Sequence, residues 1–295
     1  MKANNNTMKI TLIGLGIMGN GMARNLLQKH GPITVYNRTS GPAEVLQSMG
    51  AVVATSVPEA VRDADLVITM LANPQVVERL MLGQKGGLVH MKKGAIWMDS
   101  TTVDPIFSGK CNEEATQAGI RFVDAPVTGT KPHALAGELS FFVGGSPELI
   151  EELTPVLHFM GPRVLHLGPV TSGASYKILL NLMLAQSMVV FSEAVLLGEK
   201  LGFDRTFLLE NLPKAPVIAP FTQAKAQMIA AGDESVHFPL ELMLKDVHLA
   251  NKLAYEKGQP MYLAGITESL YAGANQEGLS RSDFSSIFKW LSKEE

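Results

Sequence analysis

The sequence predicts an α/β domain with a doubly wound sheet, followed by an all-α domain, with one long interdomain helix joining them. Short β-like runs alternate with helical segments over the first half, and no convincing strand pattern occurs after about residue 168. Such alternation favours parallel strands covered on both faces, and right-handed crossovers then wind the sheet in both directions. We therefore place the two domains at residues 1–168 and 169–295.

The strands and helices of the first domain follow from hydrophobic periodicity and from turn residues at the ends of each run. The predicted strands are Ile10–Ile13, Ile33–Tyr36, Val52–Ala54, Leu66–Thr69, Ile96–Met98, Phe122–Ala125 and Leu139–Val143. The predicted helices between them are Met18–Lys29, Val57–Ala64, Pro74–Leu82, Pro105–Ala118 and Pro147–Phe159.

The long helix is predicted over Gly173–Lys200, which is apolar and contains no proline. At 1.5 Å per residue it would be about 40 Å long. Because it is apolar around most of its surface, we expect it to be buried on several sides. Further helices are predicted at Arg205–Asn211, Phe221–Ala230, Leu240–Glu256, Met261–Ala274 and Asp283–Leu291.

Composition excludes several classes of partner. The net charge is −3 and the Lys and Arg residues are scattered, which disfavours nucleic acid as a ligand. We expect no membrane span, because polar residues interrupt even the most apolar stretch, Ile178–Leu197. The polar N-terminal tail, residues 1–9, lacks the apolar core of a secretory signal, and Met8 is an alternative start. A single cysteine, Cys111, suits a reducing, cytoplasmic location.

No metal site is expected. The seven histidines show no ligand spacing near a carboxylate or thiolate cluster. His133 lies just after the segment Asp124–Thr130 and could contact a ligand bound there, but a solvated loop histidine explains it more simply. Cys111 lies in a predicted helix without a basic neighbour, so we expect it to pack in the core rather than react.

A glycine-rich turn follows the first predicted strand and opens the first predicted helix, with the sequence Gly14-Leu15-Gly16-Ile17-Met18-Gly19. Gly14 permits the tight turn, Gly16 lets a pyrophosphate approach the backbone, and Gly19 allows close packing of helix on strand. The N-terminus of the helix offers N–H groups and partial positive charge to phosphates. The pattern predicts a Rossmann-type dinucleotide site, with a plain glycine turn as the alternative.

The end of the second predicted strand indicates which dinucleotide binds. NAD sites usually place Asp or Glu there to bind the ribose 2′-hydroxyl, whereas this chain has Asn37, Arg38 and Thr39 after Tyr36. The Arg38 guanidinium can pair with a 2′-phosphate, and Asn37 and Thr39 can add neutral hydrogen bonds. NADP is therefore favoured over NAD. The alternative is that Arg38 is a solvated loop residue.

A polar stripe occurs at the start of the long helix. Lys177 and Asn181 are four residues apart and so share one face, among otherwise apolar neighbours. An ammonium buried there without a partner would be costly or would have a lowered pKa, which favours a cleft over bulk solvent. By itself the pattern leaves two interpretations open, a catalytic lysine and a lysine that extends its head to water along an apolar surface.

Several motifs occur together in order. They are Gly14–Gly19, Met70–Pro74, Asp99–Pro105, Asp124–Thr130, Gly173–Asn181 and Phe238–Leu249. With them the whole chain resembles the β-hydroxyacid dehydrogenase family, which includes 3-hydroxyisobutyrate, tartronate semialdehyde and glyoxylate/succinic semialdehyde reductases. The resemblance implies a hydride-transferring enzyme.

The resemblance also implies roles for individual residues. Lys177 would be the general acid and base, and Asn181 would hold the lysine and the substrate oxygen. Leu71 and Ala72 would lie along the cofactor, Thr102 would reach the nicotinamide ribose, and Lys245 would close over the cofactor. The substrate carboxylate would bind at Thr128, Gly129 and Thr130. We expect burial to lower the Lys177 pKa towards neutrality.

The candidate substrate motif departs from the usual family form, DAPVSGG, at Thr128 and Thr130. Thr130-Lys131-Pro132 resembles the glyoxylate/succinic semialdehyde reductase branch, which prefers NADP, but the following His133-Ala134-Leu135 does not. We therefore expect NADP(H)-dependent interconversion of a short aldehyde or oxo-acid and its hydroxy acid. The alternatives are a 3-hydroxyisobutyrate or tartronate semialdehyde enzyme, an imine reductase, and a catalytically silent NADPH-binding module. The apolar helical half also predicts a homodimer or homotetramer.

Overall fold

The computed structural model describes residues 8–293, so the polar N-terminal tail lies outside the described residues as far as Thr7. The chain forms two compact units that divide within α8 (Ser172–Lys200). The first unit ends at Lys177 and the second begins at Ile178. The division therefore falls inside the long helix, whereas the sequence places the domain boundary just before it.

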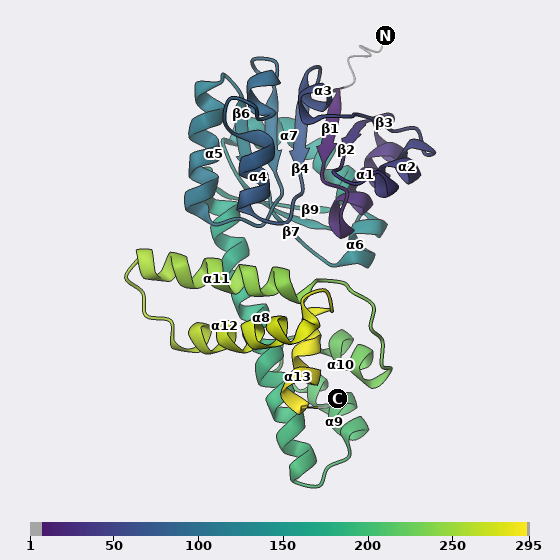
Figure 1. Cartoon of the computed structure of the whole chain (residues 1–295), viewed down its shortest axis with the longest axis vertical. Helices are drawn as coiled ribbons and strands as arrows, with labels where there is room; N and C mark the ends of the chain where they lie inside the picture. Colours follow the sequence, from purple (N-terminus) through teal and green to yellow (C-terminus); the bar gives the residue numbers. More distant parts are fainter. Residues whose placement is uncertain (1–7, 294–295) are drawn as a thin grey trace. The chain divides into compact units, whose positions relative to one another are not determined.

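The first unit contains a nine-stranded sheet, whose strands lie in the order β3-β2-β1-β4-β5-β6-β8-β7, with β9 paired to β8. Pairing is parallel from β3 across to β6, and β8 runs antiparallel to both β6 and β7. The strands are β1 (Ile10–Ile13), β2 (Thr34–Tyr36), β3 (Val52–Val53), β4 (Leu66–Thr69), β5 (Ile96–Asp99), β6 (Arg121–Asp124), β7 (Val127–Thr128), β8 (Ser140–Gly144) and β9 (Arg163–Gly168). The predicted doubly wound, mainly parallel sheet is confirmed (Figure 1).

Helices cover both faces of this sheet because both faces are apolar. Alternate residues of one strand enter different cores: Leu12 packs in one cluster and its neighbour Ile13 in another, and Met98 and Trp97 divide in the same way. The helices are α1 (Ile17–Lys29), α2 (Gly41–Gln47), α3 (Val57–Val61), α4 (Pro74–Met81), α5 (Pro105–Gln117), α6 (Lys131–Ala136) and α7 (Pro147–Met160).

Four short α-helices and strands of this unit were not predicted, α2, α6, β7 and β9, and neither was the 3₁₀ turn at Leu88–His90. Both helices have a proline in the first turn, where its missing N–H is tolerated. In the sequence such a proline resembles a loop signal, and this is why the two helices were missed. Strand β9 carries the polar residues Arg163 and His166 and is only partly buried, so its hydrophobic alternation is weak. Its parallel pairing with β8 is a tertiary property.

The second unit is helical, and within the described residues it contains only one isolated β-bridge, Pro239 with Asp283. Its helices after α8 are α9 (Arg205–Asn211), α10 (Thr222–Ala230), α11 (Leu240–Glu256), α12 (Tyr262–Ala274) and α13 (Ile287–Ser292). Helices α11 and α12 run side by side (Figure 1). The last predicted helix begins later than expected, because a 3₁₀ turn at Phe284–Ser286, capped by Asp283, precedes α13.

The expectation that α8 is buried on several sides is wrong for the single chain. Leu179, Met183, Val190 and Leu197 are all exposed, while Ile178, Met188 and Val195 lie in the core of the second unit. By length and composition alone α8 is long and apolar enough to cross a membrane, a test that the buried core helix of a soluble protein also passes, and half of its most apolar window is buried inside the chain. The helix therefore has one buried face and one exposed apolar face.

Candidate active site

The glycine turn has the geometry that a dinucleotide requires. Gly14 has φ +99°, and a Cβ there would overlap the Met70 carbonyl oxygen. A Cβ on Gly19 would overlap the Gly14 carbonyl oxygen, so the helix and the strand approach closely at this residue. Gly16 differs, because a Cβ there would meet nothing within 4 Å. Gly16 is also the N-cap residue of α1, and because it has no side chain, no side chain occupies the N-terminal N–H groups of the helix at this position. A diphosphate fits these residues.

The loop after β2 is tied to the glycine turn through Asn37. The Asn37 Oδ1 accepts a hydrogen bond from the Leu15 N–H at 3.0 Å, and its Nδ2 donates to the Thr39 carbonyl and hydroxyl oxygens, both at 3.0 Å. The Asn37 amide thus holds the two loops together. Arg38 is exposed, and no ion pair to it occurs within residues 8–293. Its guanidinium is therefore available to an anionic ligand.

A buried network joins the loops that follow β4 and β5. The Leu71 N–H donates to the Thr101 hydroxyl at 3.0 Å, and the Thr101 N–H donates to Asp99 Oδ1 at 3.0 Å. The same Asp99 oxygen accepts from the Thr69 hydroxyl at 2.7 Å. Burial raises the pKa of Asp99 to about 6, although hydrogen bonds from Thr101 and Thr69 favour its ionised form. Leu71 is thereby positioned from one buried carboxyl group through Thr101, a role of Asp99 that the sequence motif alone did not reveal, and the next residue, Thr102, is partly exposed.

The candidate substrate loop combines β7 with the start of α6. Thr128 ends β7 and is partly exposed, and Gly129 has φ +126°. Thr130 caps α6: its N–H donates to His133 Nδ1 at 3.2 Å, and its hydroxyl lies 3.0 Å from the same nitrogen. His133 therefore stabilises the loop at the beginning of a helix, rather than being merely solvated.

Lys177 and Asn181 lie one turn apart on α8, and both are buried, with exposed fractions of 9% and 2%. Asn181 donates from Nδ2 to Asp246 Oδ2 at 2.5 Å, within the second unit. Because the amide nitrogen faces Asp246, the amide oxygen of Asn181 remains an acceptor on the other side. Asp246 lies within the Phe238–Leu249 motif, but nothing in the sequence pattern indicates its role.

Lys245 and Asp246 are adjacent on α11. The Lys245 Nζ lies 2.9 Å from Asp246 Oδ1, an ion pair without good hydrogen-bond alignment. Asp246 is 1% exposed, so its charge is compensated by Lys245 and by the Asn181 amide. Asp246 thus links two of the predicted site residues.

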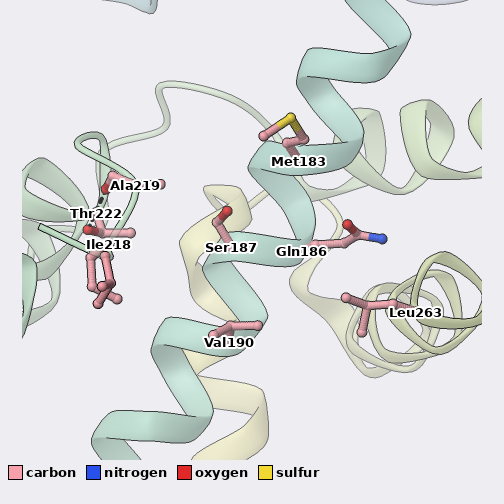
Figure 2. Close-up of a pocket in the computed structure, with 9 residues that line it drawn as sticks. Met183, Gln186, Ser187, Val190, Ile218, Ala219, Thr222 and Leu263 are labelled. Atoms are coloured by element: carbon pink, nitrogen blue, oxygen red, sulfur yellow. Dashed lines mark hydrogen bonds between the residues drawn. The ribbon is translucent and has the colours of Figure 1, made fainter.

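Other chemistries find little support in the described part of the chain. No group of three or more His, Cys, Asp or Glu residues between 8 and 293 is arranged to hold a metal ion. Cys111 is buried, and burial raises the pKa of its thiol far above the usual range, so it is not a nucleophile. An open groove of about 240 Å³ in the second unit contains none of the predicted site residues (Figure 2).

The fold and the site together define a class of protein. A doubly wound sheet leads through a tight glycine turn into an uncapped helix N-terminus, and a helical unit follows that begins on a helix with a buried lysine. These are the features of a nicotinamide-dinucleotide-dependent dehydrogenase.

Comparison with known proteins identifies the family. Residues 9–168 match the model of the NAD binding domain of 6-phosphogluconate dehydrogenase, and residues 171–291 match that of the NAD-binding domain of NADP-dependent 3-hydroxyisobutyrate dehydrogenase. The chain therefore belongs to the β-hydroxyacid dehydrogenase family, and it is an oxidoreductase that acts on hydroxyl donors. The resemblance seen in the sequence is confirmed.

Three relatives illustrate the similarity. Glyoxylate/succinic semialdehyde reductase 2, chloroplastic, of Arabidopsis thaliana is 33% identical over 97% of this chain and 80% of its own length. Mitochondrial 3-hydroxyisobutyrate dehydrogenase of Mus musculus is 34% identical over 97% of this chain and 88% of its own length. The structure of Mycobacterium tuberculosis 3-hydroxyisobutyrate dehydrogenase with L-serine has a TM-score of 0.83 and 29% identity, covering 97% of this chain and 99% of that one.

Proposed function

We propose that this protein is an NADP(H)-dependent reductase that interconverts a short aldehyde or oxo-acid and its hydroxy acid, with glyoxylate or succinic semialdehyde as the type of substrate. The observation that carries the proposal is the buried Lys177 at the start of α8, in the same compact unit as the glycine turn. A lysine that is 9% exposed among apolar neighbours has lost most of its hydration. Such a group is suited to exchanging a proton with a substrate rather than with water.

The residues of the chain divide the work of the reaction. NADPH, when bound, supplies the hydride. Lys177 donates a proton from Nζ to the carbonyl oxygen of the substrate, and Asn181 orients that oxygen and the lysine. Thr128, Gly129 and Thr130 form the loop that binds the substrate carboxylate, through the Thr128 hydroxyl and the Gly129 N–H, because the Thr130 N–H is already bound to His133.

The preference for NADP over NAD rests on Arg38. It is exposed at the end of β2, and no carboxylate stands beside it at Asn37 or Thr39 to repel a 2′-phosphate. Because Asn37 is already engaged with Leu15 and Thr39, the guanidinium is the main recognition group of this loop. Leu71, Ala72, Thr102 and, from the second unit, Lys245 complete the proposed cofactor contacts.

The proposal is tested with the Lys177→Ala variant. Removing a general acid typically costs about 10² to 10⁴ in rate, so turnover should fall by that factor while NADPH affinity stays unchanged. Lys200→Ala, an exposed lysine on the same helix, is the matched control and should leave turnover intact. Near-normal turnover of Lys177→Ala with intact NADPH binding would refute the assignment.

The substrate is tested by NADPH oxidation with glyoxylate, succinic semialdehyde, tartronate semialdehyde and methylmalonate semialdehyde, side by side. The proposal expects the highest kcat/KM for one of the first two. Preference for either of the last two would instead establish the hydroxyisobutyrate or tartronate alternative. Reduction of imines would instead indicate the imine reductase alternative, and tight NADPH binding with no turnover across the panel would indicate a catalytically silent module. Either result would contradict the roles proposed for Lys177 and Asn181.

We also propose that the protein is a homodimer or homotetramer in which the exposed face of α8 contacts a second copy. Exposed apolar residues recur on this helix and just beyond it at intervals of four and seven: Leu179, Met183, Val190, Leu197 and Leu201. This is the spacing of helices that pack along a common seam. A soluble monomer rarely exposes such a contiguous apolar surface.

The groove beside this face extends the same surface. Figure 2 shows Met183, Gln186 and Val190 along α8, with Ile218 on one side of the helix and Leu263 on the other. Sedimentation of the double variant Met183→Glu/Val190→Glu should show a smaller species than the unaltered chain. Val45→Glu is the control, because it places the same charge on an exposed apolar residue of the first unit. It should not change the size of the sedimenting species. An unaltered chain that sediments as a monomer would refute the oligomer.

A further inference from the structure

Asp124, the last residue of β6, is 1% exposed, and both of its carboxylate oxygens bind the start of α8. Oδ1 accepts a hydrogen bond from the Thr171 N–H at 2.7 Å, and Oδ2 accepts one from the Ala174 N–H at 2.7 Å. The first N–H groups of a helix have no partner within the helix, and a carboxylate there also meets the positive end of the helix dipole. Lys177 lies only three residues beyond Ala174, less than one turn away.

Two further features hold the same turn of α8 against the sheet. A Cβ on Gly173 would overlap the Phe142 carbonyl oxygen of β8 and lie 3.0 Å from the Asp124 carbonyl oxygen and Oδ2. The helix therefore packs directly against the backbone of two strands at Gly173, where there is no room for a side chain. Thr171 has φ +85°, a conformation that β-branched residues rarely adopt. Its N–H is held by Asp124, and its carbonyl accepts from the Ser175 hydroxyl at 2.8 Å.

We propose that Asp124 is a positioning residue for the reaction, because its two oxygens set the rotation and the axial position of the first turn of α8 and thereby place Lys177. The proposal rests on Lys177 being the proton donor. A displacement of about 1 Å in a reacting group can cost about 10² in rate, so a small movement of this turn is enough to matter. Two hydrogen bonds to residues three apart restrain both rotation and translation, which a single hydrogen bond does not.

Stability alone does not explain a carboxylate at this position. Burial raises the pKa of Asp124 to about 6, although the N–H groups of Ala174 and Thr171 favour the ionised form. The charge is thus costly to bury, and a neutral residue of the same shape avoids that cost. What the carboxylate offers, and the amide of asparagine cannot, is two acceptor oxygens for two N–H donors.

The decisive variant is Asp124→Asn, which keeps the shape and replaces one acceptor by an NH₂ group facing a donor. We expect single-turnover hydride transfer, measured per bound NADPH with the best substrate of the panel, to slow by up to about 10². NADPH affinity should stay within about twofold, because the glycine turn is unaltered. The control is Asp204→Asn, which changes the cap of α9 in the second unit and should leave the rate unchanged.

Counting the rate per bound NADPH separates positioning from loss of folded protein, because unfolded chains bind no NADPH. An unchanged rate per bound NADPH in Asp124→Asn would overturn the proposal. If this variant does not fold, Asp124→Ser, which is small and neutral, replaces it with the same expected slowing and the same refuting result.

A double-mutant cycle tests whether Asp124 acts through Lys177. In the Lys177→Ala background Asp124→Asn should have no further effect, since the group that it positions is gone. If the rate of the double variant falls by the product of the two single-variant factors, Asp124 acts independently of Lys177, and the proposal is overturned. Near-normal turnover of Lys177→Ala by itself would refute the proposed function, and the Asp124 proposal with it. A large loss in Lys177→Ala with full activity in Asp124→Asn would refute only the latter.

Discussion

Asp99 is expected to contribute to a fall in the unfolding free energy of the first unit as pH rises from about 4 to about 6, in the same direction as Asp124. Burial raises the pKa of the Asp99 carboxyl from 3.8 to about 6. The native protein therefore holds the proton more tightly than the unfolded chain does. The stability from this group is complete below the unfolded pKa and is lost as pH rises through the native pKa. At about 1.4 kcal/mol per pKa unit, the difference corresponds to about 3 kcal/mol.

The assay is urea unfolding between pH 4 and pH 7.5, followed by the fluorescence of Trp97, which donates to the Thr69 hydroxyl that binds Asp99. The chain has two tryptophans, so a Trp290→Phe background isolates this signal. Asp99→Asn keeps the shape but does not ionise, so it should gain about 3 kcal/mol relative to the unaltered chain as pH rises through this range.

Asp65→Asn is the control of opposite sign. Although burial opposes it, hydrogen bonds from Lys92 and the Lys9 N–H lower the pKa of Asp65, so its contribution is lost as pH falls. If the unfolding free energies of Asp99→Asn and of the unaltered chain change in parallel with pH, the raised pKa of Asp99 is refuted.

Two other predictions concern cofactor choice and the second unit. Arg38→Ala should raise the KM for NADPH by about 10- to 100-fold, since a hydrogen bond to a charged group contributes about 1.5–3 kcal/mol, and should leave the KM for NADH nearly unchanged. Equal effects on both cofactors would contradict 2′-phosphate recognition. Lys225→Ala should destabilise the second unit by about 3–5 kcal/mol in urea unfolding, because it leaves the Asp283 carboxylate buried without its partner at 2.7 Å. Although burial favours the protonated acid, Lys225 lowers the pKa of Asp283, so this contribution should be lost as pH falls below about 4. An unchanged unfolding midpoint would refute it.

Much of the fold was predictable because its signals are local. The glycine turn, the strand before it and the helix after it lie within about twenty residues, and each has its own periodicity or turn chemistry. The elements that escaped prediction lack such a signal. Strand β7 has only two residues, and α6 has only six and begins with a proline in its first turn.

The candidate site was predictable in part for the same reason. Lys177 and Asn181 stand out because a helix repeats every 3.6 residues and their neighbours are apolar. The carboxyl groups that hold the site were not visible, since their partners are remote in the chain. Asp99 binds Thr69 across 30 positions, and Asp246 binds Asn181 across 65.

The sequence by itself determined the class of fold, the dinucleotide turn and the polar pair Lys177 and Asn181 on an otherwise apolar helix, because each pattern lies in residues that are neighbours along one strand or one helix. Only the tertiary structure decided that Asp124 binds the start of α8 across 47 positions, and that α8 keeps one apolar face exposed. The physical reason is that burial and hydrogen-bond partnership depend on which elements pack together. Hydrophobic pattern states that a helix face is apolar, but not what covers it.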